Sequence, residues 1–517
     1  MAALTGRGAA DTSRGMASPA ETAAPSPWLS LPAVAAIVLV LAAVRLAVGA
    51  HLGLSFDESY YTDWSTSLQV GYLDHPPAVA WLIAAGRALA GNNELGMRLF
   101  AVLCGLGTTA ALYRLGVLLA NRSVAGLAAL LYNLTPVMGL GFITTPDPPS
   151  ALFWTATLWA VAEFMVSERA AWWLLAGVFA GLGLWSKYTD AFLAPGLLLF
   201  VLADGARWRW LVRWPIWAAA ALALIVFAPV IWWNAQRKWA SFRFQGQRTV
   251  TTGIDPNWGG NLIDLLAGQA LYLGPILLLC ALFGILAFLY RPADSRRSGL
   301  ALPVWSSLPL IAYFVFHAFH AHVEANWLIP IGPSLALAGA WMALGLWRRI
   351  FWLGGATIGL QMLIGLVITV AIYAQALWQP FDFGGPDRTA TETRGWSKLR
   401  YDIASVATAN GARWIATSGN FGLTGELASY FLFAGSKLPV REVNEPERWE
   451  FAPPLDATTL AMPALFVTPA TALPDGLFAQ GRKVGEVVRD GGRWPLEKYT
   501  LFLVSEPSAT VAKNLGR

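Results

Sequence analysis

Residues 31–61 read LPAVAAIVLVLAAVRLAVGA followed by HLGLSFDESYY. The first stretch is almost entirely apolar and has the length that a helix needs to cross a bilayer. Asp57 and Glu58 follow shortly after it. The run also resembles a signal peptide with a cleavage site at Val48-Gly49-Ala50. We favour an uncleaved helix, because it anchors the acidic segment at the membrane surface.

The composition of the whole chain is that of a membrane protein. Of its 517 residues, 56% are hydrophobic and 13% are charged, whereas soluble domains are about 25% charged. Many of the 26 Trp residues lie at the ends of apolar runs, as they do at bilayer interfaces. The net charge of +5 comes without a nucleic-acid-binding motif, so no nucleic acid partner is expected. The two cysteines, Cys104 and Cys280, lie in apolar runs and are expected to be inert thiols.

Apolar runs recur along most of the chain. They predict an α-helical polytopic membrane protein with about eleven spans, at 31–50, 97–118, 123–142, 149–166, 171–186, 189–203, 215–233, 266–290, 301–319, 327–346 and 350–378. Arg-rich connections are typical of the cytoplasmic side. With the N-terminus inside, the segments expected outside are 51–96, 144–149, 187, 234–265, 317–326 and everything after 379.

Three parts of the chain are expected. Residues 1–27 are rich in Ala, Gly, Ser and Pro and predict a disordered cytoplasmic N-terminus. Residues 28–389 form the transmembrane module, with its catalytic external loop at 51–96. Residues 390–517 predict a small α/β domain on the outer face. Its expected strands lie at 413–417, 464–467, 483–488 and 498–504, and its expected helices at 404–410 and 425–433.

Acidic residues concentrate on the predicted outer face. Asp57 and Glu58 follow a span directly, and a carboxylate in low-dielectric surroundings is a suitable general base. Two solvated loop acids are an equally good interpretation. Asp74 and His75 precede a Pro-Pro pair, which fixes their direction. Asp147, between two spans, either caps the following helix or joins Asp57 at one site.

Basic residues gather on the same face. Lys187 and Tyr188 lie at the outer end of a predicted span. The Lys side chain either extends to the membrane interface or contacts a phosphate. Arg243 and Arg248 stand in the external segment 234–265, which breaks the charge rule. Guanidinium groups bind phosphate through paired hydrogen bonds, so this segment suits an anionic headgroup, although general attraction to anionic lipid also explains it.

A further polar group contains His317, His320, His322, Glu324 and Asn326. Its composition invites a zinc site, but its spacing matches no clear motif. A hydrogen-bonding wall around a phosphate or sugar fits equally well, and we predict no metal ligands.

Together these motifs resemble bacterial members of the dolichyl-phosphate-mannose protein mannosyltransferase superfamily. The resemblance rests on FDESYY (56–61), GYLDHPP (71–77), TPDPP (145–149), WSKY (185–188), WASFRFQ (239–245) and EANW (324–327), in this order. It covers roughly 30–450 and includes the aminoarabinose and galacturonic acid transferases that modify lipid A. It implies the glycosyltransferase-C fold, with 11–13 transmembrane helices, in the bacterial cytoplasmic (inner) membrane.

The resemblance also implies a reaction. A polyprenyl-phosphate-linked sugar is the donor, and the sugar moves with inversion to a hydroxyl of a periplasmic acceptor, such as lipid A, core oligosaccharide, a polysaccharide or a protein. The family's catalytic Asp corresponds to Asp57, and its second-loop Asp to Asp147. Some relatives have Lys where this chain has His75, so the charge there is expected to depend on pH. No cofactor is expected to be required, although some relatives use a divalent metal, and a monomer is expected.

Two other functions share many of these features. A flippase for a lipid-linked sugar would also need the spans and an anionic-lipid site, but its pathway would place polar residues on both sides. An oligosaccharide ligase would use a similar donor with a wider cleft.

Overall fold

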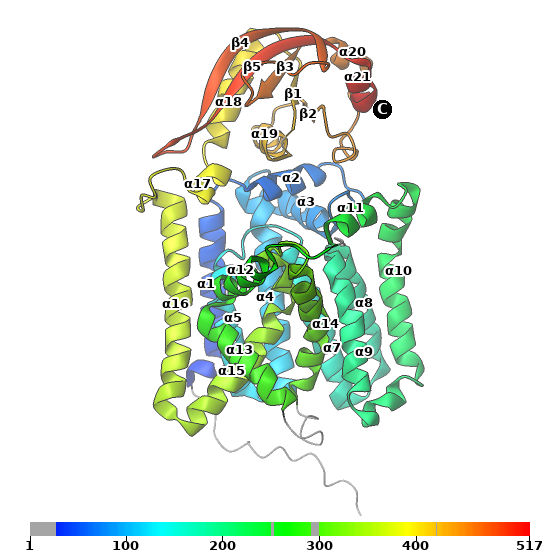
Figure 1. Cartoon of the computed structure of the whole chain (residues 1–517), viewed down its shortest axis with the longest axis vertical. Helices are drawn as coiled ribbons and strands as arrows, with labels where there is room; N and C mark the ends of the chain where they lie inside the picture. The colour runs from blue at the N-terminus through cyan, green and yellow to red at the C-terminus, as the bar shows by residue number, and fades with distance from the viewer. Residues whose placement is uncertain (1–26, 250–252, 291–298, 420, 517) are drawn as a thin grey trace, which may run out of the picture.

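The computed structural model describes residues 27–249, 253–290, 299–419 and 421–516. A bundle of long helices carries a small mixed α/β domain at one end (Figure 1). The expected N-terminal segment 1–27 lies outside the described residues except for residue 27, which begins the short helix η1 (Pro27–Leu29). Mostly helical structure with a C-terminal sheet domain confirms the predicted fold class.

Within the described ranges, seven helices are long and apolar enough to cross a membrane. They are α1 (Leu31–Gly49), α4 (Glu94–Leu119), α7 (Asp147–Ser167), α10 (Trp214–Gln236), α14 (Ala301–Ala318), η5 with α15 (Ala325–Arg349) and α16 (Phe351–Trp378). Helices α12 (Trp258–Leu273) and α13 (Pro275–Leu289) meet at a bend of 108° and make an eighth if counted as one span.

The remaining predicted spans fall on shorter helices. These are α5 (Arg122–Asn133) with α6 (Pro136–Gly139), α8 (Ala170–Ser186), and η2 (Tyr188–Phe192) with α9 (Leu193–Leu202). A straight crossing takes about 20 residues, and these segments are shorter. The difference between eleven predicted spans and seven or eight long ones therefore lies in these short helices. Helix η3 (Gly205–Trp210) connects α9 to α10.

The segment 51–96 is not an open loop. It forms α2 (Phe56–Trp64) and α3 (Ala78–Ala90), which lie at the outer end of the bundle beneath the α/β domain (Figure 1). Ser55 begins α2 with a capping box: its hydroxyl accepts from the backbone N–H of Glu58, and the Glu58 carboxylate accepts from the N–H of Ser55. This reciprocal arrangement satisfies two helix-end donors and fixes the direction of the first turn.

The outer domain contains a five-stranded sheet in the order β2-β1-β3-β5-β4. The strands are β1 (Trp414–Thr417), β2 (Val440–Glu442), β3 (Ala464–Thr468), β4 (Phe478–Asp490) and β5 (Pro495–Pro507). Pairing is parallel for β1 with β2 and β3, and antiparallel for β5 with β3 and β4. The helices are α17 (Arg388–Thr393), α18 (Trp396–Ala409), α19 (Phe421–Phe433), α20 (Ala457–Ala461) and α21 (Ala509–Leu515). Every strand and helix predicted here has a counterpart, whereas the short strand β2 and the short helices α17, α20 and α21 were missed.

The outer domain and the helix pair α2–α3 share one core. Helix α19 packs so closely on α2 that a Cβ on Gly425 would lie 2.8 Å from the backbone nitrogen of Tyr60. The rings of Trp449 and Phe451 insert beside Tyr60, Trp64 and Tyr72, with ring centroids 5.2 Å apart for Tyr60 and Trp449. Aromatic contacts of this kind stabilise an interface beyond the area they bury. The outer domain therefore holds α2 in place from above.

Candidate active site

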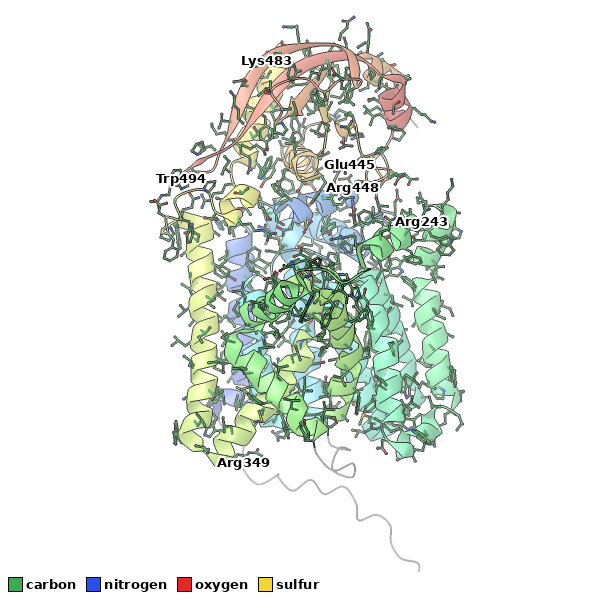
Figure 2. The ribbon with its side chains drawn as sticks, viewed as in Figure 1. Arg243, Arg349, Glu445, Arg448, Lys483 and Trp494 are labelled. Carbon is green, nitrogen blue, oxygen red and sulfur yellow. The ribbon has the colours of Figure 1, made fainter. Side chains whose placement is uncertain are left out.

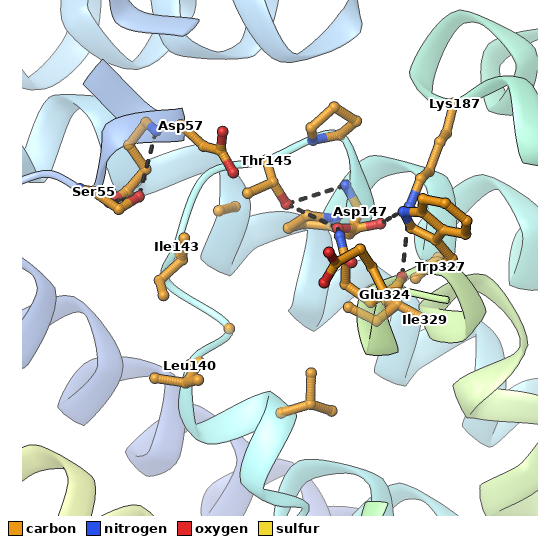
Figure 3. Close-up of a pocket in the computed structure, with 18 of the residues that line it drawn as sticks. Ser55, Asp57, Leu140, Ile143, Thr145, Asp147, Lys187, Glu324, Trp327 and Ile329 are labelled. Carbon is orange, nitrogen blue, oxygen red and sulfur yellow. Dashed lines mark hydrogen bonds and ion pairs between the residues drawn. The ribbon is translucent and has the colours of Figure 1, made fainter. Parts of the chain in front are cut away.

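A cavity of about 1190 Å³ opens between the outer ends of the bundle helices and the α/β domain. Its lower part in Figure 3 is apolar, with Leu140 and Ile143 on the wall. Its upper part is polar and contains Asp57, Asp147 and Lys187. One enclosed space thus joins an apolar channel to a cluster of charged groups.

Glu58 links the two acidic segments that the sequence singled out. Its carboxylate accepts two hydrogen bonds from Arg98 of α4, at 2.8 and 2.6 Å, and one from the backbone N–H of Thr144, at 3.0 Å. Arg98 in turn donates to the carbonyls of Gly49, Leu52 and Gly53. Both side chains of this ion pair are 1% exposed. Since its oxygens are already occupied, Glu58 is suited to positioning the site and not to proton transfer.

The second acidic segment meets three other predicted residues. Asp147 forms an ion pair with Lys187 at 2.5 Å and accepts a hydrogen bond from the Asn326 amide at 3.0 Å. The Lys187 ammonium also reaches the carbonyl of Asn326 at 3.5 Å. Three segments that are distant in the chain therefore converge on one buried charge pair (Figure 3). Asp147 is the first residue of α7, but the N-cap position is Pro146 and no side chain caps this helix, so the alternative role of Asp147 as a helix cap is wrong.

Asp57 differs from the other acids of the cavity. Within the described residues, no hydrogen bond or ion pair holds its carboxylate, which is exposed to the cavity interior. Burial of the site raises the pKa of Asp57 to about 6, and the negative charge of Glu392 acts in the same direction. A carboxylate without a partner and with a pKa near neutrality is well suited to accept a proton.

Asp74 and His75 lie on the wall beneath the outer domain. Asp74 accepts a hydrogen bond from the Tyr60 hydroxyl at 2.8 Å and forms an ion pair with Arg448 at 3.3 Å. Burial lowers the pKa of His75 to about 3, and the positive charge of Lys187 lowers it further. The imidazole is therefore neutral at physiological pH, which corrects the expectation that its charge would vary with pH.

The basic segment 234–265 contains a helix, α11 (Ala240–Thr249), at the cavity edge. Arg248 and Gln245 line the cavity, and the Gln245 amide donates to the backbone carbonyl of Asp74. Arg243 does not line it and projects from the outer surface of the molecule (Figure 2). The structure therefore brings only one of the two predicted arginines to the site.

The remaining predicted residues lie at the rim. Tyr188 lines the cavity and shares a hydrogen bond of 2.8 Å with the Ser241 hydroxyl. Glu324 lines it as well, whereas His322 lies outside, 3.6 Å from Asp264. No group of three or more His, Cys, Asp or Glu within the described part of the chain is placed to hold a metal ion.

Four charged residues that line the cavity were not predicted. Arg98 lies near the start of the predicted span 97–118, where a buried charge calls for a partner. Arg388 and Glu392 come from α17, and Arg448 comes from the loop after β2. These last three belong to the junction with the outer domain and stand in no recognisable motif.

Several known proteins are similar to this chain in sequence. Residues 74–233 match the sequence model of a family described as dolichyl-phosphate-mannose-protein mannosyltransferase. Lipid A galacturonosyltransferase RgtD of Rhizobium johnstonii is 26% identical over 443 residues, which cover 84% of this chain and 88% of that protein. An undecaprenyl phosphate-alpha-4-amino-4-deoxy-L-arabinose arabinosyl transferase of Pseudomonas aeruginosa is 32% identical over 183 residues, 32% of each chain.

The fold is that of a solved membrane protein. The crystal structure of ArnT from Cupriavidus metallidurans bound to undecaprenyl phosphate superposes with a TM-score of 0.59 at 15% identity. The alignment covers 95% of this chain and 100% of ArnT. The predicted resemblance is confirmed: the chain is a multi-pass membrane protein with the ArnT-like glycosyltransferase-C fold, and its residues 74–233 are similar to the dolichyl-phosphate-mannose-protein mannosyltransferase family.

Proposed function

We propose that the protein is an inverting glycosyltransferase that moves one sugar from a polyprenyl-phosphate carrier to a hydroxyl of an envelope glycolipid. Lipid A and the lipopolysaccharide core are the favoured acceptors. Support comes from the names of its relatives, which include a lipid A galacturonosyltransferase, and from the undecaprenyl phosphate bound by ArnT. The polar and apolar halves of the cavity suit a sugar phosphate and an isoprenoid chain, respectively.

The site is proposed to face the periplasm of a bacterial inner membrane. Arg349 lies at the end of the bundle opposite the α/β domain, and Arg243 lies at the domain end (Figure 2). Arg348, Arg114 and Arg122 belong to connections at the same end as Arg349, by the direction of their helices (Figure 1). Basic connections are retained in the cytoplasm, so the cavity and the α/β domain face outward.

Asp57 is the proposed general base. The observation that carries this role is that no described residue forms a hydrogen bond or ion pair with its carboxylate. The acceptor hydroxyl attacks the anomeric carbon and transfers its proton to Asp57. The bond between that carbon and the phosphate oxygen breaks, so the polyprenyl phosphate leaves with the electron pair. Attack from the face opposite the leaving group inverts the anomeric configuration.

The cations at the opposite side of the polar region stabilise the leaving group. Arg248 is exposed to the cavity and offers a guanidinium group for the phosphate. Lys187 also lines the cavity, where its ammonium balances the negative charge of Asp147 and reaches the carbonyl of Asn326. Fixed donors aimed at developing charge lower the barrier without reorganising during the reaction. Neutral His75 contributes hydrogen bonding and not charge.

The test is a transfer assay with purified protein in detergent or liposomes. A polyprenyl-phosphate sugar, labelled in both the sugar and the phosphate, is mixed with a lipid A acceptor. We expect labelled sugar on the acceptor and an equal amount of free polyprenyl phosphate. Movement of intact donor across the bilayer without release of polyprenyl phosphate would instead establish a flippase. A preference for oligosaccharide donors would indicate a ligase. The monomeric state and the absence of a nucleic acid partner stay predictions.

A further inference from the structure

The short helix α17 presents one polar face to the cavity. Arg388, Thr389, Glu392 and Thr393 all line it. Arg388 and Glu392 are four residues apart, and so are Thr389 and Thr393. Residues four apart are neighbours on a helix surface, so all four side chains lie on one side of the helix. The helix connects the membrane span α16 to the outer domain (Figure 1). An entire helix face is therefore directed into the site, although no predicted motif includes it.

Arg388 is available to bind a ligand. Its Nε donates to Glu392 at 2.7 Å, and the side chain is 92% exposed. Within the described part of the chain, its two terminal nitrogens contact no acceptor. The hydrogen bond to Glu392 fixes the plane of the guanidinium and leaves its two-pronged edge open. Such an edge matches the geometry of a phosphate or carboxylate.

Arg388 and Arg248 belong to different sides of the cavity, because α17 and α11, the helices that carry them, lie on opposite sides of the outer end of the bundle (Figure 1). The charged and phenolic neighbours that act on Arg388 are Glu392, Tyr272 and Glu324. The positive charge of Arg248 instead acts on Asp74 and His75. The cavity therefore has two separate cationic poles and not one shared cluster.

Asp57 lies within reach of both sides. The charges of Glu392 and Arg388 of α17 act on its carboxyl, and so do those of Asp74 and Asp147. A donor whose phosphate is bound at Arg248 and Lys187 directs its anomeric carbon toward Asp57. The attacking hydroxyl must approach from the face opposite the phosphate, which is the side of α17.

We propose that the polar face of α17 is the acceptor site and that Arg388 binds an oxyanion carried by the acceptor sugar. The ligand is a sugar with a phosphate or carboxylate near the reacting hydroxyl. Glu392, Thr389 and Thr393 hydrogen-bond to its neighbouring hydroxyls. This inference rests on the proposed glycosyl transfer, and it adds the chemical class of the acceptor.

The experiment compares Arg388→Gln and Arg388→Lys with a control, Arg493→Gln. Arg493 forms an exposed ion pair of 2.7 Å with Asp382 close to the same end of α16 and does not line the cavity. Three acceptors are used: a glycolipid with a phosphorylated glucosamine headgroup, the same glycolipid after phosphatase treatment, and one with a uronic acid in the headgroup. Two further quantities are measured for each variant: the donor KM, and the rate at which the donor is hydrolysed to polyprenyl phosphate when no acceptor is present.

Losing a charge-assisted hydrogen bond corresponds to a change of about tenfold to a hundredfold. We expect Arg388→Gln to raise the KM of the phosphorylated or the uronic acid acceptor by this factor, and the acceptor affected identifies the anion. Arg388→Lys should recover part of the loss. For the uncharged acceptor, the KM of Arg388→Gln should equal that of the wild type. Donor KM should stay unchanged, and the variant should still hydrolyse the donor, because the donor phosphate does not contact Arg388 in this proposal.

Two results would overturn the inference. In one, Arg388→Gln uses every acceptor as the wild type does. In the other, it raises donor KM instead, which would assign Arg388 to the donor phosphate. Failure of the wild-type protein to release polyprenyl phosphate in any assay would contradict the proposed function itself, so the two failures are separable.

Discussion

Replacing Glu58 by Gln removes the negative charge from a buried link between α2, α4 and the second acidic segment. The substituted side chain would keep nearly the same shape, but its amide offers one acceptor oxygen where the carboxylate offers two. Arg98 would then remain buried among three backbone carbonyls without a counter-charge. Breaking a buried ion pair in this way costs about 3–5 kcal/mol. We therefore expect a clear fall in the thermal unfolding midpoint of the protein in detergent.

The assay follows Trp fluorescence on heating, with Glu168→Gln as control. Glu168 pairs with Arg209 at 2.9 Å, and both side chains are more than half exposed, so this control should change the midpoint little. The double variant Glu58→Gln/Arg98→Met should be less destabilised than Glu58→Gln, because it no longer buries an unpaired charge. If Glu58→Gln unfolds at the same temperature as Glu168→Gln, the assigned role of Glu58 is wrong.

Two further outcomes follow from the site. Arg448→Gln should raise donor KM more than it lowers kcat, because Arg448 pairs with Asp74 at 3.3 Å, and Gln245 of α11, the helix that carries Arg248, donates to the backbone carbonyl of the same residue. Steady-state kinetics checks this against Arg441→Gln, since Arg441 of β2 donates to the carbonyls of Val440 and Pro453 and does not line the cavity. A loss in kcat alone would contradict the expectation. The value of kcat/KM should rise about tenfold per pH unit up to about pH 6 and level off above it, because the pKa of Asp57 is raised to about 6 and the base must be ionised. A profile that is flat from pH 4.5 to 7 would exclude Asp57 as the titrating group.

Much of the site could be predicted because its residues lie at the ends of membrane spans, all on the same side of the membrane. Asp57, Asp147, Lys187 and Asn326 come from four separate segments, and topology alone places them at the same surface. The ends of all spans lie at the same membrane surface. The orientation of the spans, inferred from the basic residues of their connections, therefore also predicts which polar residues lie near one another. The buried ion pair between Asp147 and Lys187 is an example of two such residues in direct contact.

The individual roles within each segment depend on helix geometry. Arg243 and Arg248 are five residues apart, which on a helix with 3.6 residues per turn separates them by about 140°. Only Arg248 therefore faces the cavity. Asp57 and Glu58 diverge for the same reason, being about 100° apart. The pattern Ser55-x-x-Glu58 is a capping-box signature, and it could have identified Glu58 as a structural residue.

The contributions of the outer domain could not be predicted in this way. Arg388 and Arg448 are far along the chain from the acidic segments, and neither belongs to a periodic or motif-like pattern. Their positions depend on how α19 and the aromatic residues Trp449 and Phe451 pack against α2. Packing between distant elements leaves no local signal in one sequence.

The most direct test of the central claim is the rate of sugar transfer by Asp57→Asn. The control is Asp402→Asn, because Asp402 of α18 pairs with Lys398 at 3.9 Å and does not line the cavity. Asn keeps the shape of the side chain but cannot accept the proton of the acceptor hydroxyl. Removing a general base lowers rates by about 10²–10⁴-fold. We predict a fall in kcat of this size, with donor KM and the unfolding midpoint close to those of the wild type. Transfer at the wild-type rate by a folded Asp57→Asn protein would contradict the role of Asp57.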